Sequence, residues 1–314
     1  MKAEKFFTHP IGVIGSSLLV TFLWGSAFPI IKLSYAHLNI GPDDIGKQIL
    51  FAGYRFFLAA IIIFLMFSLW KKQNRFRKST AMSLVKIGLF QTFLQYLLFY
   101  IGLSYSTGIQ GSIIAGTTSF FQILLAHFMY RNDALSWRKG LGLAVGFAGI
   151  VVVNMTKGTI HLAFGIGELL LLAAMLFYSY GNILAKNASE KMDVTYLTAY
   201  QMLFGGVGLI VVGALFTGIF PFHFDWVSFG MLMYLAIVSS VGFVSWNNVM
   251  KYNKVGKVSM YLFFTPVFGV ILSSILLNEK VHLFVILGLL LVVSGIIIVN
   301  RAPTVVRRKL HNAS

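Results

Sequence analysis

The chain has 314 residues, of which 58% are hydrophobic and only 11% charged, and its mean hydropathy is +0.83. Because an ordinary soluble domain carries about 25% charged residues, this composition excludes a typical water-soluble fold. The chain has no cysteine, which excludes disulfides, cysteine-ligated metals and thiol chemistry. The formal net charge of +16 fits either nucleic-acid binding or the cationic loops of a membrane protein, so the positions of the charges decide between the two.

Ten apolar segments follow one another along the chain, and each is about long enough to cross roughly 30 Å of hydrocarbon as an α-helix. They predict an all-α integral membrane protein. The predicted transmembrane helices are Ile11–Ile31, Gln48–Trp70, Ala81–Leu103, Ile109–Tyr130, Trp137–Met155, Leu162–Ala185, Val194–Phe216, Trp226–Met250, Val258–Leu277 and Val281–Val299. The first segment is too long and too aromatic for a cleaved signal peptide, so we expect it to stay in the mature protein.

The basic residues orient these segments. With the N-terminus in the cytoplasm, most of the 25 lysines and arginines fall at cytoplasmic ends and loops, and only Lys32, Lys47, Lys157 and Lys280 fall outside. This asymmetry satisfies the positive-inside rule and predicts a multi-pass protein of a bacterial plasma membrane with both termini in the cytoplasm. Because membrane topology accounts for the scattered charge, we expect the lipid bilayer, and no nucleic acid, as a partner.

The sequence also repeats itself at a constant offset of 146 residues, at which Asp133 aligns with Glu279 and Gly142 with Gly288. Apolar helices resemble one another by composition alone, but an offset with paired acidic and glycine positions indicates a true repeat. Since five spans is an odd number, the second half enters the membrane from the opposite side, which predicts two inverted five-helix repeats with a substrate site near the midplane. The predicted domains are residues 1–155, residues 160–300 and a basic cytoplasmic tail at residues 301–314.

Several short stretches together resemble EamA-type members of the drug/metabolite transporter superfamily. They are Leu23–Phe28, Tyr54–Phe56 followed by Ala59, Leu276–Glu279, and Gly288 with Gly295. The resemblance covers nearly the whole chain and implies ATP-free transport of amino acids, metabolites or drugs, often outward. In the first half the counterpart of Leu-Asn-Glu is Arg131–Asp133, whose carboxylate is one carbon shorter.

Aromatic and amide side chains inside the spans suit a substrate with an apolar body and a few polar groups. Gln91 and Gln95 are one helical turn apart, and either interhelical hydrogen bonding or substrate contact explains them. For Trp246 the alternative is an interfacial anchor beside Lys251. The predicted substrate-binding residues are Trp24, Phe28, Gln91, Gln95, Tyr96, Tyr100, Ser119, Gln122, Tyr178, Asn182, Trp246 and Asn247.

Charged residues within the spans are few, and an ionisable group in a membrane is by default a functional hypothesis. Glu168 is the one carboxylate inside a predicted span, so it is the candidate for proton coupling, unless it lies close enough to the outer surface to stay hydrated. His127 is a weaker candidate. Arg55 can pair with Glu168 or attract a substrate carboxylate, although a structural arginine that reaches toward the interface is the more ordinary explanation.

Motifs of enzymes and ATP-driven pumps are missing from the sequence. It contains no His-Glu-x-x-His, no Gly-x-Ser-x-Gly and no Walker A motif, so we expect no enzyme activity, no metal and no cofactor. We predict a secondary transporter that exports amino acids or related small amphipathic metabolites by alternating access, as a monomer or homodimer. The alternatives are an uptake carrier for a small metabolite or, further away, a channel or receptor.

Overall fold

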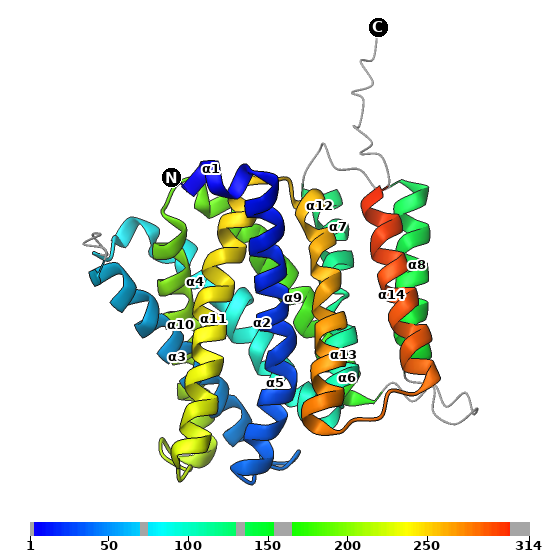
Figure 1. The fold of residues 1–314 in the computed structure, drawn as a ribbon. Helices are drawn as coiled ribbons and strands as arrows, with labels where there is room; N and C mark the ends of the chain where they lie inside the picture. The colour runs from blue at the N-terminus through cyan, green and yellow to red at the C-terminus, as the bar shows by residue number, and fades with distance from the viewer. Residues whose placement is uncertain (1–2, 70–74, 130–135, 154–164, 302–314) are drawn as a thin grey trace, which may run out of the picture.

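The computed structural model describes residues 3–69, 75–129, 136–153 and 165–301 (Figure 1). All regular structure within these ranges is helical, and long helices stand side by side. The helices are α1 (Ala3–Thr8), α2 (Pro10–His37), α3 (Ile45–Leu69), η1 (Lys78–Thr80), α4 (Ala81–Gly88), η2 (Leu89–Leu94), α5 (Gln95–Tyr105), α6 (Gly108–Ala115), α7 (Thr118–Met129), α8 (Trp137–Val153), α9 (Ile166–Ser189), α10 (Val194–Thr217), α11 (Trp226–Tyr252), α12 (Val255–Val258), η3 (Ser259–Phe263), α13 (Phe264–Leu277) and α14 (Leu283–Arg301).

Helices occupy the predicted apolar segments, and in the described ranges seven helical stretches are long and apolar enough to cross a membrane. These seven are Pro10–His37, Ile45–Ser68, Lys78–Tyr105, Gly108–Met129, Ile166–Ser189, Val194–Thr217 and Trp226–Tyr252. The segments near residues 137, 264 and 283 form the shorter helices α8, α13 and α14. The predicted span ends Trp70, Tyr130, Met155 and Leu162, and the predicted tail beyond Arg301, lie outside the described residues.

Three predicted spans are not uniform α-helices. The third passes through α4, the π-helical turn η2 and α5, and the ninth through α12, the 3₁₀ turn η3 and α13. The fourth is divided at Gly116–Thr117, between α6 and α7. In a membrane such breaks are tolerated where they are buried in protein or line a cavity, and π-turns are frequent at functional sites. All three broken spans contribute residues to the same cavity, which is described below.

Close packing between glycine-bearing faces joins helices α8 and α14. A Cβ atom at Gly149 would lie 2.6 Å from the carbonyl oxygen of Gly288, and one at Gly295 would lie 2.5 Å from that of Gly142. Only glycine permits this approach of two backbones, as expected for small-residue helix contacts in membranes. This pair stands at one side of the molecule, away from α2, α5 and α11 (Figure 1).

A carboxylate fastens the start of α6. Both Glu279 carboxylate oxygens accept hydrogen bonds, one from the backbone N–H of Gly108 and one from that of Ile109, at 2.8 Å each. These amides belong to the first turn of a helix and have no partner within it, so the carboxylate satisfies groups that are costly to leave unpaired. Asp133, the counterpart of Glu279 in the first half, lies outside the described residues.

Candidate functional site

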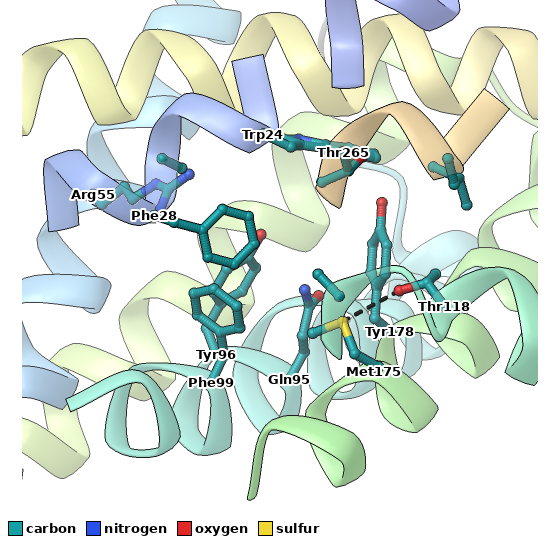
Figure 2. A pocket seen from close by; sticks show the side chains of 13 residues that line it. Trp24, Phe28, Arg55, Gln95, Tyr96, Phe99, Thr118, Met175, Tyr178 and Thr265 are labelled. Carbon is teal, nitrogen blue, oxygen red and sulfur yellow. Dashed lines mark hydrogen bonds between the residues drawn. The ribbon is translucent and has the colours of Figure 1, made fainter. Parts of the chain in front are cut away.

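A cavity lies in the middle of the bundle, between helices of the first and second halves of the chain (Figure 2). The volume of this cavity that is open to the centre of a water molecule is about 60 Å³, which is room for several waters at roughly 10–15 Å³ each. From the first half, α2, α3, α5, α6 and α7 line it, and from the second half α9, η3 and α13. The lining residues are Trp24, Ala27, Phe28, Arg55, Gln95, Tyr96, Phe99, Ala115, Thr118, Met175, Tyr178, Leu262 and Thr265.

Five aromatic side chains contribute to the wall. Trp24 meets Tyr178 edge to face with ring centroids 5.7 Å apart, and Phe99 lies 5.7 Å from Phe28 and 5.8 Å from Tyr96. Such edge-to-face and tilted contacts are the favoured geometry for aromatic pairs, and they hold the rings in place. The wall therefore offers a pre-formed apolar surface to a flat or aliphatic solute.

Arg55 supplies the charge of the cavity wall. Its side chain is only 1% exposed. Its Nε donates to Ser239 Oγ at 2.7 Å and to the carbonyl oxygen of Leu235 at 3.1 Å, and its Nη1 donates to Tyr100 Oη at 3.1 Å. The guanidinium also lies 5.7 Å from the centre of the Tyr96 ring, in cation–π range.

These contacts overturn two interpretations of Arg55 made from the sequence. Its side chain turns into the protein rather than toward the interface, so the expectation of a snorkelling structural arginine is wrong. It does not pair with Glu168, because Glu168 Oε1 instead accepts a hydrogen bond from Ser106 Oγ at 3.2 Å. Substrate contact is the interpretation that stays open.

Several polar atoms of the cavity wall have no hydrogen-bond partner among the described residues. They include Trp24 Nε1, Gln95 Oε1 and Thr265 Oγ1, all of which are buried. A buried polar group without a partner costs roughly 1–3 kcal/mol, so these atoms indicate where water or a solute binds. Figure 2 shows Arg55 at one side of the cavity and Thr118 and Tyr178 at the other.

Five of the twelve predicted substrate-binding residues line this cavity: Trp24, Phe28, Gln95, Tyr96 and Tyr178. The structure does not test their role in binding. Two others lie in contact with the wall, since Tyr100 accepts a hydrogen bond from Arg55 and the buried Trp246 packs 5.8 Å from Trp24.

The full burial of Trp246 shows that the alternative of an interfacial anchor is wrong.

Three predicted residues form a separate amide cluster, which we define as Gln91, Asn182 and Asn247 with Thr198. Gln91 Nε2 donates to Asn182 Oδ1 at 2.7 Å and to Asn247 Oδ1 at 3.3 Å. Asn247 Nδ2 in turn donates to Thr198 Oγ1 at 3.0 Å. The cluster joins η2, α9, α10 and α11, so for Gln91 the structure shows the interhelical hydrogen bonding that was one of its two explanations.

The remaining pair, Ser119 and Gln122, is also directed at a neighbouring element. Ser119 Oγ donates to the carbonyl oxygen of Ser259, whose hydroxyl donates to Gln122 Oε1 at 2.7 Å. The cavity is lined instead by Ala115 and Thr118, which stand on either side of the break at Gly116–Thr117.

The two predicted proton-coupling residues are outside the cavity wall. Glu168 lies in the first turn of α9 and is 7% exposed, so it is buried rather than freely hydrated. His127 is partly exposed near the end of α7. Neither residue contributes to the cavity lining, and their part in coupling stays a prediction.

Sequence reasoning missed several lining residues, namely Ala27, Phe99, Thr118, Met175, Leu262 and Thr265. Thr265 carried a usable signal, because at an offset of 146 it aligns with Ser119 beside the break in the fourth span. The apolar members carried none, since alanine, leucine and methionine are ordinary residues in any membrane helix. Within the described ranges there is no group of three or more histidine or acidic side chains placed to hold a metal ion.

Comparison with protein families gives a match along nearly all of the chain. A model of the EamA-like transporter family matches twice, at residues 11–155 and at residues 165–301.

Several relatives of the chain are named as transporters, in agreement with this family match. The chain is 25% identical to "Uncharacterized transporter YoaV" of Bacillus subtilis (strain 168), over 88% of this chain and 92% of that protein. It is also 25% identical to "Probable amino-acid metabolite efflux pump" of Escherichia coli (strain K12), over 90% and 92% of the two chains. A shorter match, 25% identical over 60% of this chain and 58% of the relative, is with "S-adenosylmethionine/S-adenosylhomocysteine transporter" of Chlamydia trachomatis serovar L2.

One solved crystal structure resembles the fold with a TM-score of 0.65 at 15% identity, covering 90% of this chain and 96% of the other. At this identity the likeness concerns the fold alone.

Proposed function

The chain belongs to the EamA-like transporter family of the drug/metabolite transporter superfamily, and from this premise we propose that it exports amino acids or related small amphipathic metabolites as a secondary transporter. It is a multi-pass membrane protein and a transporter, not an enzyme. The observation that carries the proposal is the central cavity, which combines an aromatic wall, a buried arginine and unpaired polar atoms between the two halves of the chain. The export direction is supported by the relative named as an efflux pump.

The proposed architecture is ten spans in two inverted five-helix repeats. Equivalent helices of the two halves pack directly on each other, α3 on α10 and α8 on α14. In Figure 1, α8 and α14 run side by side in opposite directions, as an inverted repeat requires. The glycine contacts support the same relation, because at the offset of 146 Gly142 aligns with Gly288 and Gly149 with Gly295, so exchanging the two halves turns the Gly142–Gly295 contact into the Gly288–Gly149 contact.

Two lysines repeat this symmetry at opposite ends of the molecule. Lys32 Nζ, near the end of α2, donates to the carbonyl oxygens of Leu103 and Ser106 at the end of α5. Lys186 Nζ, near the end of α9, donates to those of Met250 and Asn253 at the end of α11. Each lysine binds the carbonyls at a helix C-terminus, where positive charge is favoured. Under alternating access, we propose that the two contacts form and open in turn as the cavity faces one side or the other.

We propose a bacterial plasma membrane with both termini in the cytoplasm. α1 and the end of α14 lie at the same end of the bundle (Figure 1), which agrees with an even number of spans. The chain lacks cysteine, so the variants His223→Cys and Lys254→Cys each carry one thiol, at opposite ends of α11. In intact cells a membrane-impermeant maleimide is expected to label His223→Cys and not Lys254→Cys; the reverse pattern would invert the orientation.

Energy coupling and binding follow as further parts of the proposal. Glu168 is the proposed proton-coupling carboxylate and His127 the second candidate, whereas substrate contact is assigned to the five predicted residues that line the cavity. If Glu168 carries the proton, Glu168→Gln transports without the pH dependence of the wild type. A variant with wild-type pH dependence would remove Glu168 from the mechanism.

Counterflow in ATP-free proteoliposomes tests the function itself. Vesicles are loaded with an unlabelled compound, and the entry of the same labelled compound is followed for a panel of amino acids and metabolites. Saturable counterflow is expected for at least one member, whereas conductance without saturation would indicate a channel. Direction is read in cells that generate an amino acid from an imported dipeptide, since an exporter hastens its loss and an uptake carrier does not.

A further inference from the structure

Arg55 is a cation without a counter-charge among the residues that the structure describes. Among the thirteen residues that line the cavity it is the only charged side chain, and its three hydrogen-bond acceptors are a carbonyl and two hydroxyl oxygens, all neutral. Within the described part of the chain no carboxylate lies within ion-pair distance of it. A buried charge without a partner is costly, and inside a membrane protein such groups mark ligand or ion pathways.

The guanidinium keeps donors free for a ligand. Nε donates two of the three hydrogen bonds and Nη1 the third, while Nη2 donates none to a described residue. One N–H of Nη1 and both of Nη2 therefore remain available. These two nitrogens form the fork that binds a carboxylate through two parallel hydrogen bonds, which are stronger than neutral ones. The existing bonds to α11 and α5 hold this fork in position.

We propose that Arg55 binds the carboxylate of a substrate with a single net negative charge and an apolar body. The inference rests on the proposed transport function and narrows its substrate class. A monocarboxylate neutralises the one charge of the cavity, and the rings of Phe28, Trp24 and Tyr178 surround its apolar part. The unpaired Gln95 Oε1 accepts a hydrogen bond from a neutral donor on the substrate, such as a hydroxyl or an amide N–H.

A zwitterionic amino acid fits this cavity less well. Its ammonium group would enter a space whose described lining residues include Arg55 and no carboxylate, so the complex would keep an uncompensated positive charge. The structure therefore favours 2-hydroxy acids or N-acylated amino acids over free amino acids with the same side chain.

Counterflow of three compounds with the same phenyl body tests the charge preference. They are 3-phenyllactate, an anion; phenylalanine, a zwitterion; and phenylalaninamide, whose amide cannot serve as the carboxylate. In wild-type proteoliposomes we expect half-maximal counterflow of 3-phenyllactate at a concentration at least tenfold lower than that for phenylalanine. We expect no counterflow of phenylalaninamide. In Arg55→Gln the advantage of 3-phenyllactate disappears, while Arg55→Lys, which keeps the charge but not the fork, retains part of it. Lys86→Gln, which removes an exposed cation from α4, keeps the wild-type order.

The outcomes separate this inference from the function on which it rests. Saturable exchange of phenylalanine at least as good as that of 3-phenyllactate would overturn the inference and leave the transporter intact. An unchanged order in Arg55→Gln would overturn the role of Arg55. If no compound of this set or of the wider panel exchanges, the proposed function fails as well. The order in the wild type needs no variant, so a misfolded Arg55→Gln protein does not remove the test.

Discussion

The cavity and the amide cluster lie one helical turn apart and use their polar groups in opposite ways. Gln91, in the amide cluster, donates to two asparagines on two other helices. Gln95, four residues later, lines the cavity and makes no hydrogen bond to another helix among the described residues, while the Oε1 atoms of both glutamines are unpaired there. Both glutamines are buried, at 0% and 4% exposure, so burial does not distinguish them.

Interhelical hydrogen bonding is therefore the property that separates the structural amide, Gln91, from Gln95 beside the cavity. A paired amide lowers the free energy of the folded protein through its neighbours, and removing it leaves those neighbours unpaired. An amide that lines a cavity without an interhelical hydrogen bond contributes nothing of this kind to folding, and a solute or water supplies the partner of its unpaired oxygen. Matched substitutions at the two positions test this difference.

Gln91→Leu is expected to have the largest effect on stability. The substitution keeps the approximate volume but deprives Asn182 Oδ1 and Asn247 Oδ1 of their donor. We expect the free energy of unfolding to fall by about 1–2 kcal/mol, the scale of interhelical hydrogen bonds in membranes. Unfolding of the purified protein in mixed micelles measures the change. Unchanged stability would mean that the amide cluster does not hold these helices together.

Gln95→Leu is the matched substitution in the cavity. It removes an unpaired buried oxygen, so we expect equal or slightly higher stability in the same unfolding assay. Transport is expected to weaken by about tenfold, which corresponds to about 1.4 kcal/mol, because a substrate donor loses its acceptor. Counterflow of 3-phenyllactate measures this loss. If Gln95→Leu lowers stability as much as Gln91→Leu, interhelical hydrogen bonding does not separate the two glutamines.

The sequence predicted both glutamines but not this difference between them. A regular helix places residues four apart on one face, and the π-turn at Leu89–Leu94, which contains Gln91 and ends before Gln95, changes that register. Directly after the break at Gly116–Thr117, Thr118 rather than the predicted Ser119 lines the cavity. The length of the apolar segments located the helices, because the thickness of the membrane sets that length. Local departures from helical geometry depend instead on contacts with distant segments.

Arg55 is a second residue whose contacts could not be predicted from the sequence. Its position two turns inside a span marked it as unusual, but an isolated sequence gives no direction for a long flexible side chain. The acceptors that draw it inward, Ser239 and the carbonyl of Leu235, belong to α11, about 180 residues later. Burial and partners of this kind follow only from the assembled bundle.

Ser239→Ala is expected to have a smaller effect on the cavity. It removes the shortest hydrogen bond of Arg55, while the carbonyl of Leu235 and Tyr100 Oη still hold the guanidinium. We expect the concentration for half-maximal counterflow of 3-phenyllactate to rise by only about threefold, because Nε keeps its bond to the carbonyl of Leu235. The preference for the anion over phenylalanine persists, because the charge is still present. Loss of that preference in Ser239→Ala would show that Arg55 depends on this one contact.

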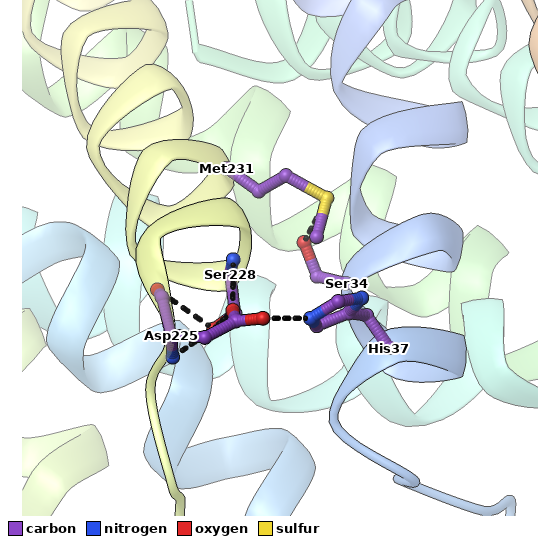
Figure 3. A network of polar contacts seen from close by, with 5 residues as sticks. All are labelled: Ser34, His37, Asp225, Ser228 and Met231. Carbon is purple, nitrogen blue, oxygen red and sulfur yellow. Dashed lines mark hydrogen bonds and ion pairs between the residues drawn. The ribbon is translucent and has the colours of Figure 1, made fainter.

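The smallest effect is expected at the end of the bundle where α11 begins and α2 ends, because the hydrogen-bonded polar groups there are exposed to solvent. Asp225 caps α11 by accepting from the backbone N–H of Ser228, and its Oδ2 lies 2.8 Å from Nε2 of His37 at the end of α2 (Figure 3). Hydrogen bonds from Ser228, followed by that from His37, lower the pKa of Asp225 from its ordinary value of 3.8. A lowered carboxylate pKa contributes stability above pH 3.8 that is lost as the pH falls further.

Acid unfolding of Asp225→Asn tests this last region against the other two. Asparagine keeps a side-chain oxygen for the cap but cannot be protonated in this range. The variant is therefore expected to lose less stability than the wild type when the pH falls below 4. The difference is expected to be small, because the carboxylate is exposed and water screens its contacts. Thermal unfolding at pH 6 and at pH 3, with wild type and variant side by side, measures it. A pH 3 difference as large as the loss in Gln91→Leu would show that exposure does not weaken a paired polar group here, and the contrast between cavity and amide cluster would then need a cause other than pairing within the bilayer.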